Sequence, residues 1–273
     1  MKKLLVLVFL LSAMVSKSQD FEGIITWKIT SEVTDPKLKA QMEEGKKKMD
    51  DPETQAQMKE MKEKMNDPQF KAMMDSNPQM KAQMEAAIKM AEGGGAGSVM
   101  PKGYIIKMKN KNVVSAMDGG MMANTSFLYL NDKNEAYTID KSAKTYTLLP
   151  QRKEDPNKKV DIKVTKTSET AKVLNYTCTK YIAESTIDGH TMEQFFWTTN
   201  EIKDMDFKSL AKQRMATGSQ SMFYDKIEGV PLKIEMKTPQ GSMIMEVTDI
   251  KKQSIPAAEF SIPTDYKAVA SKY

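Results

Sequence analysis

Cys178 and His190 are the only cysteine and the only histidine of the chain, so they are the first candidates for a nucleophile and its base. Asp188-Gly189 predicts a tight hairpin turn, which places residue 190 opposite Ile187. Cys178 lies nine residues before Ile187 on the same strand, and at ~3.3 Å per residue this is roughly 30 Å. A Cys–His pair is therefore not expected. We interpret Cys178 as a small buried hydrophobe and His190 as an exposed residue beside a turn.

Other catalytic signatures are missing from the sequence. It has no Gly-x-Ser-x-Gly motif, and the glycine-rich residues 93–98 lack the Lys-Ser/Thr pair of a phosphate loop. One histidine and one cysteine cannot supply the usual zinc ligands. The spacing of Glu201, Asp204 and Asp206 is more typical of helix capping than of catalysis. We therefore expect no enzymatic activity, no cofactor and no metal site of these types.

Methionine thioethers are the remaining soft ligands, and they favour Cu(I). Met58/Met61 and Met243/Met245 are spaced closely enough to form such clusters. However, Met58 and Met61 recur at core spacing in a predicted helix, and Met243 and Met245 alternate along a predicted strand. Packing is the preferred interpretation, and a methionine-based Cu(I) binder is kept as an alternative.

Residues 35–92 predict a helical insertion in a β-rich sequence. Its four short units each open on Asp or Asn followed by Pro, where the first side chain caps the helix and proline presets φ at the first helical position. Apolar residues recur at helical spacing in every unit and form a narrow stripe made almost wholly of methionine. Methionine is flexible and polarisable, which suits a surface that adapts to apolar ligands. The residues expected to bind a hydrophobic ligand are Met58, Met61, Met65, Phe70, Met73, Met80 and Met84.

The remainder predicts about ten short strands bounded by turn residues. Leu232, Ile234 and Met236 alternate with charged residues, and a turn at residues 239–241 leads to a matching return strand. This alternation is typical of an antiparallel sheet with one buried face. Almost no βαβ alternation occurs, so parallel α/β folds are disfavoured and an α+β fold is predicted. Residues 206–215 have helical character and are expected to cap the sheet.

The N-terminus predicts export. Lys2 and Lys3 precede an apolar run that is too short to span a bilayer, and the following residues fit cleavage just before Gln19. No lipobox cysteine follows, so we expect a periplasmic or secreted protein without a transmembrane segment. Removal of three leader lysines lowers the formal charge from +5 to about +2, and the basic residues alternate with acidic ones. A nucleic-acid partner is therefore not expected.

These patterns divide the chain into five segments. The predicted segments are a signal peptide (1–18), the first strand of the β domain (19–34), the Met-rich helical insertion (35–92), a Gly-rich linker (93–98) and the antiparallel β domain (99–273).

Several stretches resemble a family of small exported bacterial proteins grouped as domain of unknown function 4412. They are residues 21–23 (FEG), 176–181 (YTCTKY), 229–234 (GVPLKI) and 260–267 (FSIPTDYK). Asn175 precedes the second stretch at a turn position, where asparagine tolerates positive φ. The family is similar to the periplasmic lipoprotein carriers. That similarity implies a curved antiparallel half-barrel (LolA-like), with helices over its concave side and an apolar cavity between them.

A weaker, local likeness concerns residues 66–90, which resemble the Asp-Pro and Met-rich helical repeats of co-chaperones. Two functions follow as hypotheses besides copper binding. The first is a non-enzymatic binding protein for a lipid, a lipoprotein or an apolar peptide segment. The second is an interaction protein whose helical insertion contacts an outer-membrane or other envelope protein.

Overall fold

The structure is a computed structural model that describes residues 20–76, 80, 84, 88, 101–120, 122–150, 161–187, 190–205, 207, 223–224 and 226–271. No helix in these ranges is long and apolar enough to cross a membrane. Some sequence predictions lie outside the described residues. These are the signal peptide, the helix start at Asn77-Pro78, the linker 93–98, the turn at 188–189 and nearly all of the cap at 206–215.

Twelve strands form one sheet, in the order β12-β6-β5-β4-β3-β2-β1-β11-β10-β9-β8-β7. All neighbours are antiparallel except β12 and β6. The first strand lies inside the sheet between β2 and β11, so β2 returns beside β1 after the helical insertion. The strands are β1 Gly23–Val33, β2 Gly103–Lys109, β3 Asn112–Asp118, β4 Thr125–Leu130, β5 Glu135–Asp140, β6 Thr145–Leu148, β7 Asp161–Val173, β8 Tyr176–Ile187, β9 His190–Thr199, β10 Val230–Thr238, β11 Gly241–Lys252 and β12 Lys267–Ala268.

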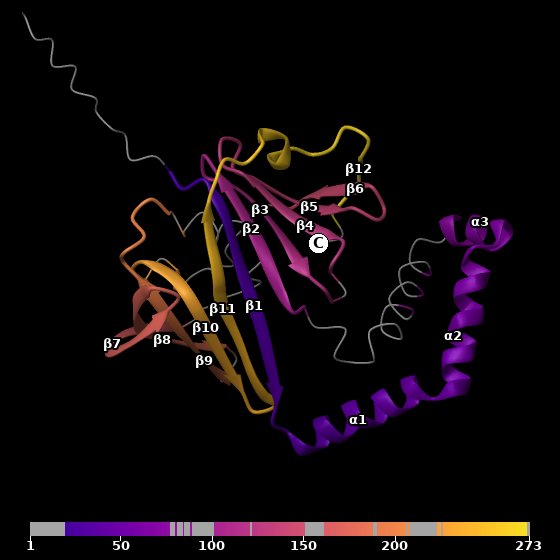
Figure 1. Ribbon diagram of the computed structural model, residues 1–273, viewed down its shortest axis with the longest axis horizontal. Coiled ribbons are helices and arrows are strands. Elements are labelled where there is room, and N and C mark those ends of the chain that lie inside the picture. The colour runs from indigo at the N-terminus through magenta and orange to yellow at the C-terminus, as the bar shows by residue number, and fades with distance from the viewer. Residues whose placement is uncertain are drawn as a thin grey trace, which may run out of the picture.

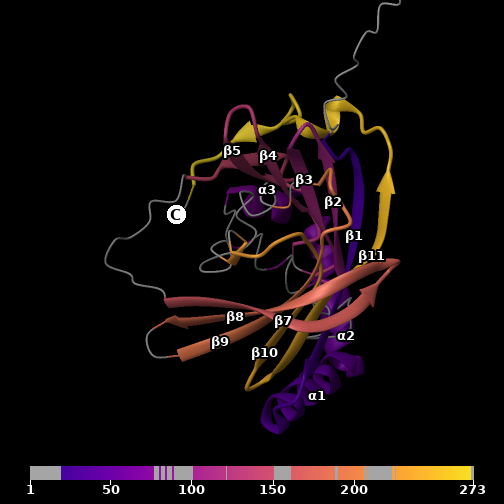
Figure 2. The ribbon, with the colours of Figure 1, turned by 90° about the vertical axis from the view of Figure 1, so that its left-hand side faces the viewer.

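The sheet is strongly curved and has the outline of a C in Figure 2, with β1 and β11 in its back and β5 and β7 in its two arms. Register shifts interrupt the pairing at Thr26/Trp27, Pro231/Lys233 and Lys166/Thr170. Such bulges bend a strand and increase its twist, which explains part of the curvature. The predicted fold class, a curved antiparallel half-barrel with a helical insertion after its first strand, is confirmed.

The larger hydrophobic core covers the concave face. Along one row of paired residues, Trp27 of β1 lies opposite Tyr104 of β2 and Val247 of β11. The Trp27 and Tyr104 rings stack, with centroids 5.4 Å apart and planes 8° apart. The segment between β9 and β10 packs into the same core through residues such as Ile202 and Phe223, and its described part lies inside the C of Figure 2. Among the described residues this segment covers the concave face.

A smaller core lies on the convex face, where the C-terminal segment crosses β3 and β4. Ile255 is buried there beside Leu128 and Tyr137. The Glu22 carboxylate accepts a hydrogen bond from the Ile255 N–H (2.7 Å), and Lys109 donates to the Ile255 carbonyl (2.8 Å). Lys109 also pairs with Glu22 at 2.9 Å. These contacts fix the C-terminal segment to the beginning of β1 and the end of β2.

The helices whose bounds are described after β1 are α1 Pro36–Asp50, α2 Pro52–Met65 and α3 Pro68–Ser76. Each begins as predicted. The side chain of the aspartate before each helix accepts a hydrogen bond from a backbone N–H of the first turn. The pairs are Asp35 with Leu38 (2.8 Å), Asp51 with Thr54 (3.1 Å) and Asp67 with Phe70 (3.1 Å). Such caps satisfy backbone donors that the first helical turn leaves unpaired.

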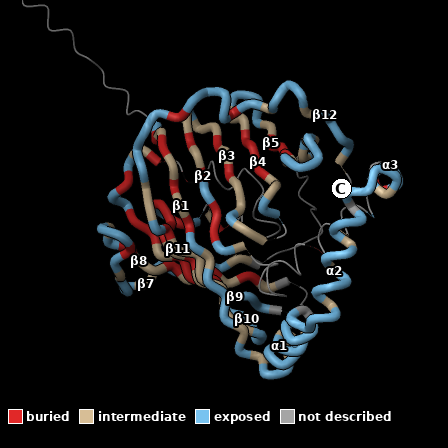
Figure 3. The backbone as a smooth tube through the Cα atoms, turned by 45° about the vertical axis from the view of Figure 1, so that its right-hand side comes forward, coloured by how far each residue is buried: buried red, intermediate tan, exposed pale blue. Residues whose placement is uncertain are grey.

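The helices form a bent arm that begins at the end of β1 and stands beside the sheet (Figure 1). Figure 3 shows that most of the arm is exposed, in contrast to the strands. In α1 and α2 no residue with a described side chain is fully buried; Leu38, Met42, Met58 and Met61 are half-buried. The apolar stripe of these two helices is therefore not covered by the described sheet residues.

Candidate functional site

A cavity of ≈ 500 Å³ lies where the segment after β9 packs beside the start of β10. Its wall combines apolar side chains with a short charged stretch. The described residues that line it are Ile202, Met205, Phe207, Tyr224, Lys226, Ile227, Glu228, Gly229, Val230 and Pro231.

Backbone and ionic contacts hold the first part of this wall in place. The Phe21 N–H donates to the Asp204 carbonyl at 2.8 Å, and the Asp204 carboxylate pairs with Lys252 at 2.8 Å. These contacts tie the segment to the chain before β1 and to the end of β11. Ile202 and Met205, on either side of Asp204, are consequently buried in the concave core.

Aromatic rings form a second part of the wall. Tyr224 meets the Phe207 ring edge to face at 5.0 Å between centroids, and it meets Phe196 of β9 at 5.8 Å. Phe223 also packs against Phe196, at 6.1 Å. Burial raises the pKa of Tyr224 to about 12, so its phenol is neutral at physiological pH. This part of the wall is apolar and uncharged.

The exposed mouth of the cavity is charged. Glu228 accepts hydrogen bonds from Lys166 of β7 (2.9 Å) and from the Tyr181 hydroxyl of β8 (3.2 Å). The hydrogen bond from Lys166 is the main cause that lowers the pKa of Glu228. Lys226 donates to the Ile162 carbonyl of β7 at 2.8 Å. Through Lys226 and Glu228 the loop before β10 is bound to the edge strand β7.

Gly229 makes the turn from this loop into β10 possible. Its φ is +82°, and a Cβ there would lie 2.5 Å from the Thr199 carbonyl oxygen. Thr199 is the β9 partner of Val230. Only glycine fits this approach without displacing the strand pair.

Trp27 Nε1 and Ser185 Oγ are buried and have no hydrogen-bond partner among the described residues. Trp27 belongs to the concave core, and Ser185 lies in the row of β8 that also carries Ala183 of this core. Leaving such a group unpaired costs roughly 1–3 kcal/mol.

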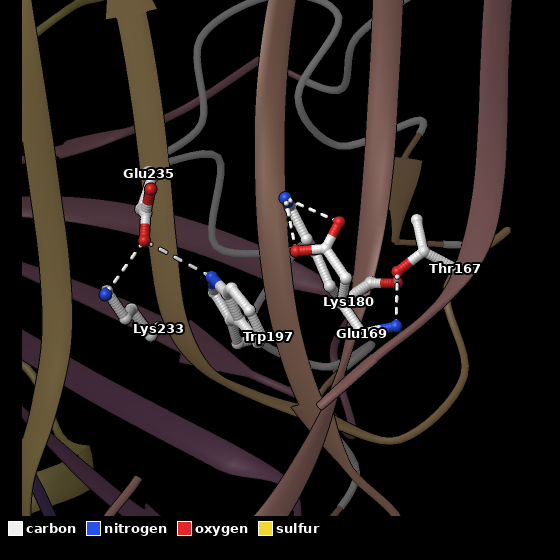
Figure 4. A network of polar contacts seen from close by, with 6 residues as sticks. All are labelled: Thr167, Glu169, Lys180, Trp197, Lys233 and Glu235. Atoms are coloured by element: carbon white, nitrogen blue, oxygen red, sulfur yellow. Dashed lines mark hydrogen bonds and ion pairs between the residues drawn. The ribbon is translucent and has the colours of Figure 1, made fainter. Parts of the chain in front are cut away.

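A polar network on the opposite face of β7 to β10 does not belong to the cavity (Figure 4). Lys180 pairs with Glu169 at 3.0 Å and lies over the Phe195 ring. Glu235 pairs with Lys233 at 2.8 Å and accepts from Trp197 Nε1 at 3.3 Å. Since these charges satisfy one another, we interpret the network as stabilising the sheet.

The residues first considered for catalysis are not assembled into a site. Cys178 is fully buried as predicted, and burial raises the pKa of its thiol to about 11. In the pairing of β8 with β9, His190 lies opposite Ile187, as the predicted hairpin turn requires.

The three carboxylates also form no group. Glu201 accepts a hydrogen bond from the Thr177 N–H, Asp204 forms an ion pair with Lys252, and Asp206 lies outside the described residues. Within the described ranges, no three His, Cys, Asp or Glu side chains are grouped to hold a metal ion.

The residues predicted to bind a ligand are not among the described residues that line the cavity. Met58, Met61, Phe70 and Met84 are half-buried, whereas Met73 and Met80 are 48% and 43% exposed. Met65 ends α2, and its side chain is not described. Whether these residues bind a ligand stays a prediction. The neighbouring Met74 is buried.

The cavity residues were missed because they follow no regular spacing. Ile202, Met205 and Phe207 are separated by three and two positions in a segment without regular structure. The available signals were the expected cap at 206–215 and the aromatic pair Phe223-Tyr224. Neither signal indicates a ligand.

The strands form a curved antiparallel half-barrel whose concave face is covered by the segment after β9. The chain belongs to the family described as Domain of unknown function (DUF4412), whose sequence model matches residues 102–266, more than half of the chain. Among solved structures, the chain is similar to that of LprF from Mycobacterium bovis. The two share 11% sequence identity with a TM-score of 0.28, over 63% of this chain and 84% of that chain. No curated protein matches the chain.

Proposed function

We propose that this protein is an exported, non-enzymatic binding protein that holds a hydrophobic ligand in the cavity between the concave face and the segment after β9. The observation that carries the proposal is the ≈ 500 Å³ space lined by Ile202, Met205, Phe207 and Ile227. Small-molecule sites typically measure ~300–1,000 Å³, a range that includes this cavity. Burying apolar ligand surface there contributes roughly 25 cal/mol per Å².

The proposed location is the periplasm or the medium. The apolar leader with its two lysines and the lack of a lipobox cysteine support this location. A carrier there meets lipids and lipidated proteins as they leave the membrane.

Fluorescence titration with 1-N-phenylnaphthylamine tests the cavity directly, because this dye brightens in apolar surroundings. Ile227→Trp adds a bulky ring to the cavity wall and narrows the space, and Ile255→Trp is the matched control in the convex core. The two isoleucines are 6% and 2% exposed, so both substitutions strain a packed core to a similar degree. We expect saturable binding by the native protein and by Ile255→Trp, and weaker binding by Ile227→Trp. Undiminished binding by a folded Ile227→Trp protein contradicts the proposal, with folding checked by circular dichroism.

A second candidate function rests on the helical arm. Its methionine stripe is half-exposed, as Met58, Met61 and Met73 show, and such a stripe can adapt to an apolar segment of an envelope protein. The full-length double variant Met58→Lys/Met61→Lys separates the two functions. It should lose cross-linking to an envelope partner while it still binds the dye. Loss of dye binding would instead assign the stripe to the ligand site.

A further inference from the structure

The mouth of the cavity contains two described ionisable residues, and only one of them is neutralised. Glu228 is compensated by Lys166 and by the Tyr181 hydroxyl, at 2.9 and 3.2 Å. The negative charge of its carboxylate is therefore balanced by the positive charge of Lys166, and it is not available for a ligand.

Among the described residues Lys226 has no such compensation. Its ammonium donates to the Ile162 carbonyl at 2.8 Å, and the described ion pair at the mouth joins Glu228 to Lys166 and does not involve Lys226. A carbonyl dipole does not cancel a full charge, and an ammonium can donate three hydrogen bonds. With Lys166 and Glu228 paired, one positive charge and up to two donors remain among the described residues at the entrance of a cavity with a mixed polar and apolar wall.

We propose that the ligand is a single-chain amphiphile with an anionic head group. Its chain lies against Ile202, Met205 and Ile227, and its head group is held by Lys226. This inference rests on the proposed function and adds the class of ligand. An anion at the mouth gains the attraction of Lys226, whereas a cationic head group meets two lysines and an already occupied carboxylate.

Displacement of 1-N-phenylnaphthylamine by three twelve-carbon probes below their micellar concentrations tests the inference at pH 8. The probes are dodecanoate, 1-dodecanol and dodecylamine, which differ in head-group charge. Because an ion pair at an exposed site has a modest effect, we expect dodecanoate to bind about two- to fivefold more tightly than 1-dodecanol. The preference should decrease at high salt.

The variants Lys226→Met and Lys226→Arg identify the responsible charge. Lys226→Met should remove the preference for dodecanoate and leave 1-dodecanol unchanged, and Lys226→Arg should keep the preference. Lys144→Met is the control, since Lys144 pairs with Asp265 near the opposite edge of the sheet.

Two results overturn the inference while the proposed function stands. One is equal or tighter binding of 1-dodecanol or dodecylamine by the native protein. The other is a Lys226→Met protein that loses affinity for all three probes equally, which would show that Lys226 only holds the cavity wall to β7. A native protein that binds neither the dye nor any probe refutes the proposed function itself, and the inference with it.

Discussion

Replacement of Gly229 by alanine should destabilise the protein and disturb the cavity at the same time. The added Cβ would lie 2.5 Å from the Thr199 carbonyl oxygen and 2.7 Å from Asn200 Oδ1. A φ of +82° also lies in the region that residues with side chains rarely adopt.

Two costs add up in this variant. A left-handed conformation costs an L-residue roughly 1–2 kcal/mol. The clash with the Thr199 backbone cannot be relieved by a side-chain rotation, so the pair Thr199–Val230 must separate. We expect a total loss of about 2–4 kcal/mol in the free energy of unfolding, within the range of strained-backbone substitutions.

Urea unfolding monitored by tryptophan fluorescence measures this loss, because both tryptophans lie in the sheet. Gly45→Ala is the matched control. Gly45 lies within α1, and a Cβ there would meet nothing within 4 Å, so the same substitution should stabilise the helix by about 0.5–1 kcal/mol. The reasoning is refuted if Gly229→Ala unfolds at the same urea concentration as the native protein.

Three further predictions follow from single contacts. Cys178 should react with a maleimide at pH 7 only after unfolding, because burial raises its thiol pKa to about 11; rapid labelling of the native protein contradicts this. The hydrogen bond from Lys109 is the main cause that lowers the pKa of Glu22 from its usual value of 4.5. The ionised carboxylate therefore stabilises the folded state above pH 4.5. This stabilisation is lost as the pH falls through the pKa that Glu22 has in the folded protein. Glu22→Gln should therefore lower the urea midpoint at pH 7 more than at pH 3, and an equal effect at both pH values would contradict the assignment. Asp51→Ala should destabilise α2 by about 1 kcal/mol, decreasing circular dichroism at 222 nm without changing tryptophan fluorescence.

Local rules predicted the sheet and the arm well because each element carries its own signal. Asp35, Asp51 and Asp67 are N-caps in the structure, and the alternation of β10 is matched by burial of Leu232 and Ile234. The two-residue β12 was missed because it is too short for alternation to show. The positive φ near Tyr176 lies at Leu174 (52°), one position before the expected Asn175, so the turn is set by strand pairing rather than by the residue that best tolerates it.

The cavity could not be predicted from local patterns, since it depends on contacts between distant segments. Lys226 contacts Ile162, and Glu228 contacts Lys166. These contacts form only because β8 and β9, which lie between β7 and β10 in the sheet, bring β7 close to the loop before β10. The methionine stripe drew the prediction of a binding site to the arm, because helical spacing is visible in sequence and irregular packing is not. The described cover of the concave side comes from the segment after β9. This segment includes residues 206–215, the stretch predicted to form a helical cap, of which only Phe207 is described.

Native mass spectrometry of the mature protein isolated from its own cells shows whether the cavity holds a hydrophobic ligand. We expect one adduct of lipid-like mass per chain, which is released under denaturing conditions, retained by Ile255→Trp and reduced in Ile227→Trp. A clean mass of the protein alone in all three samples, each still folded, would contradict the claim that the cavity holds a hydrophobic ligand.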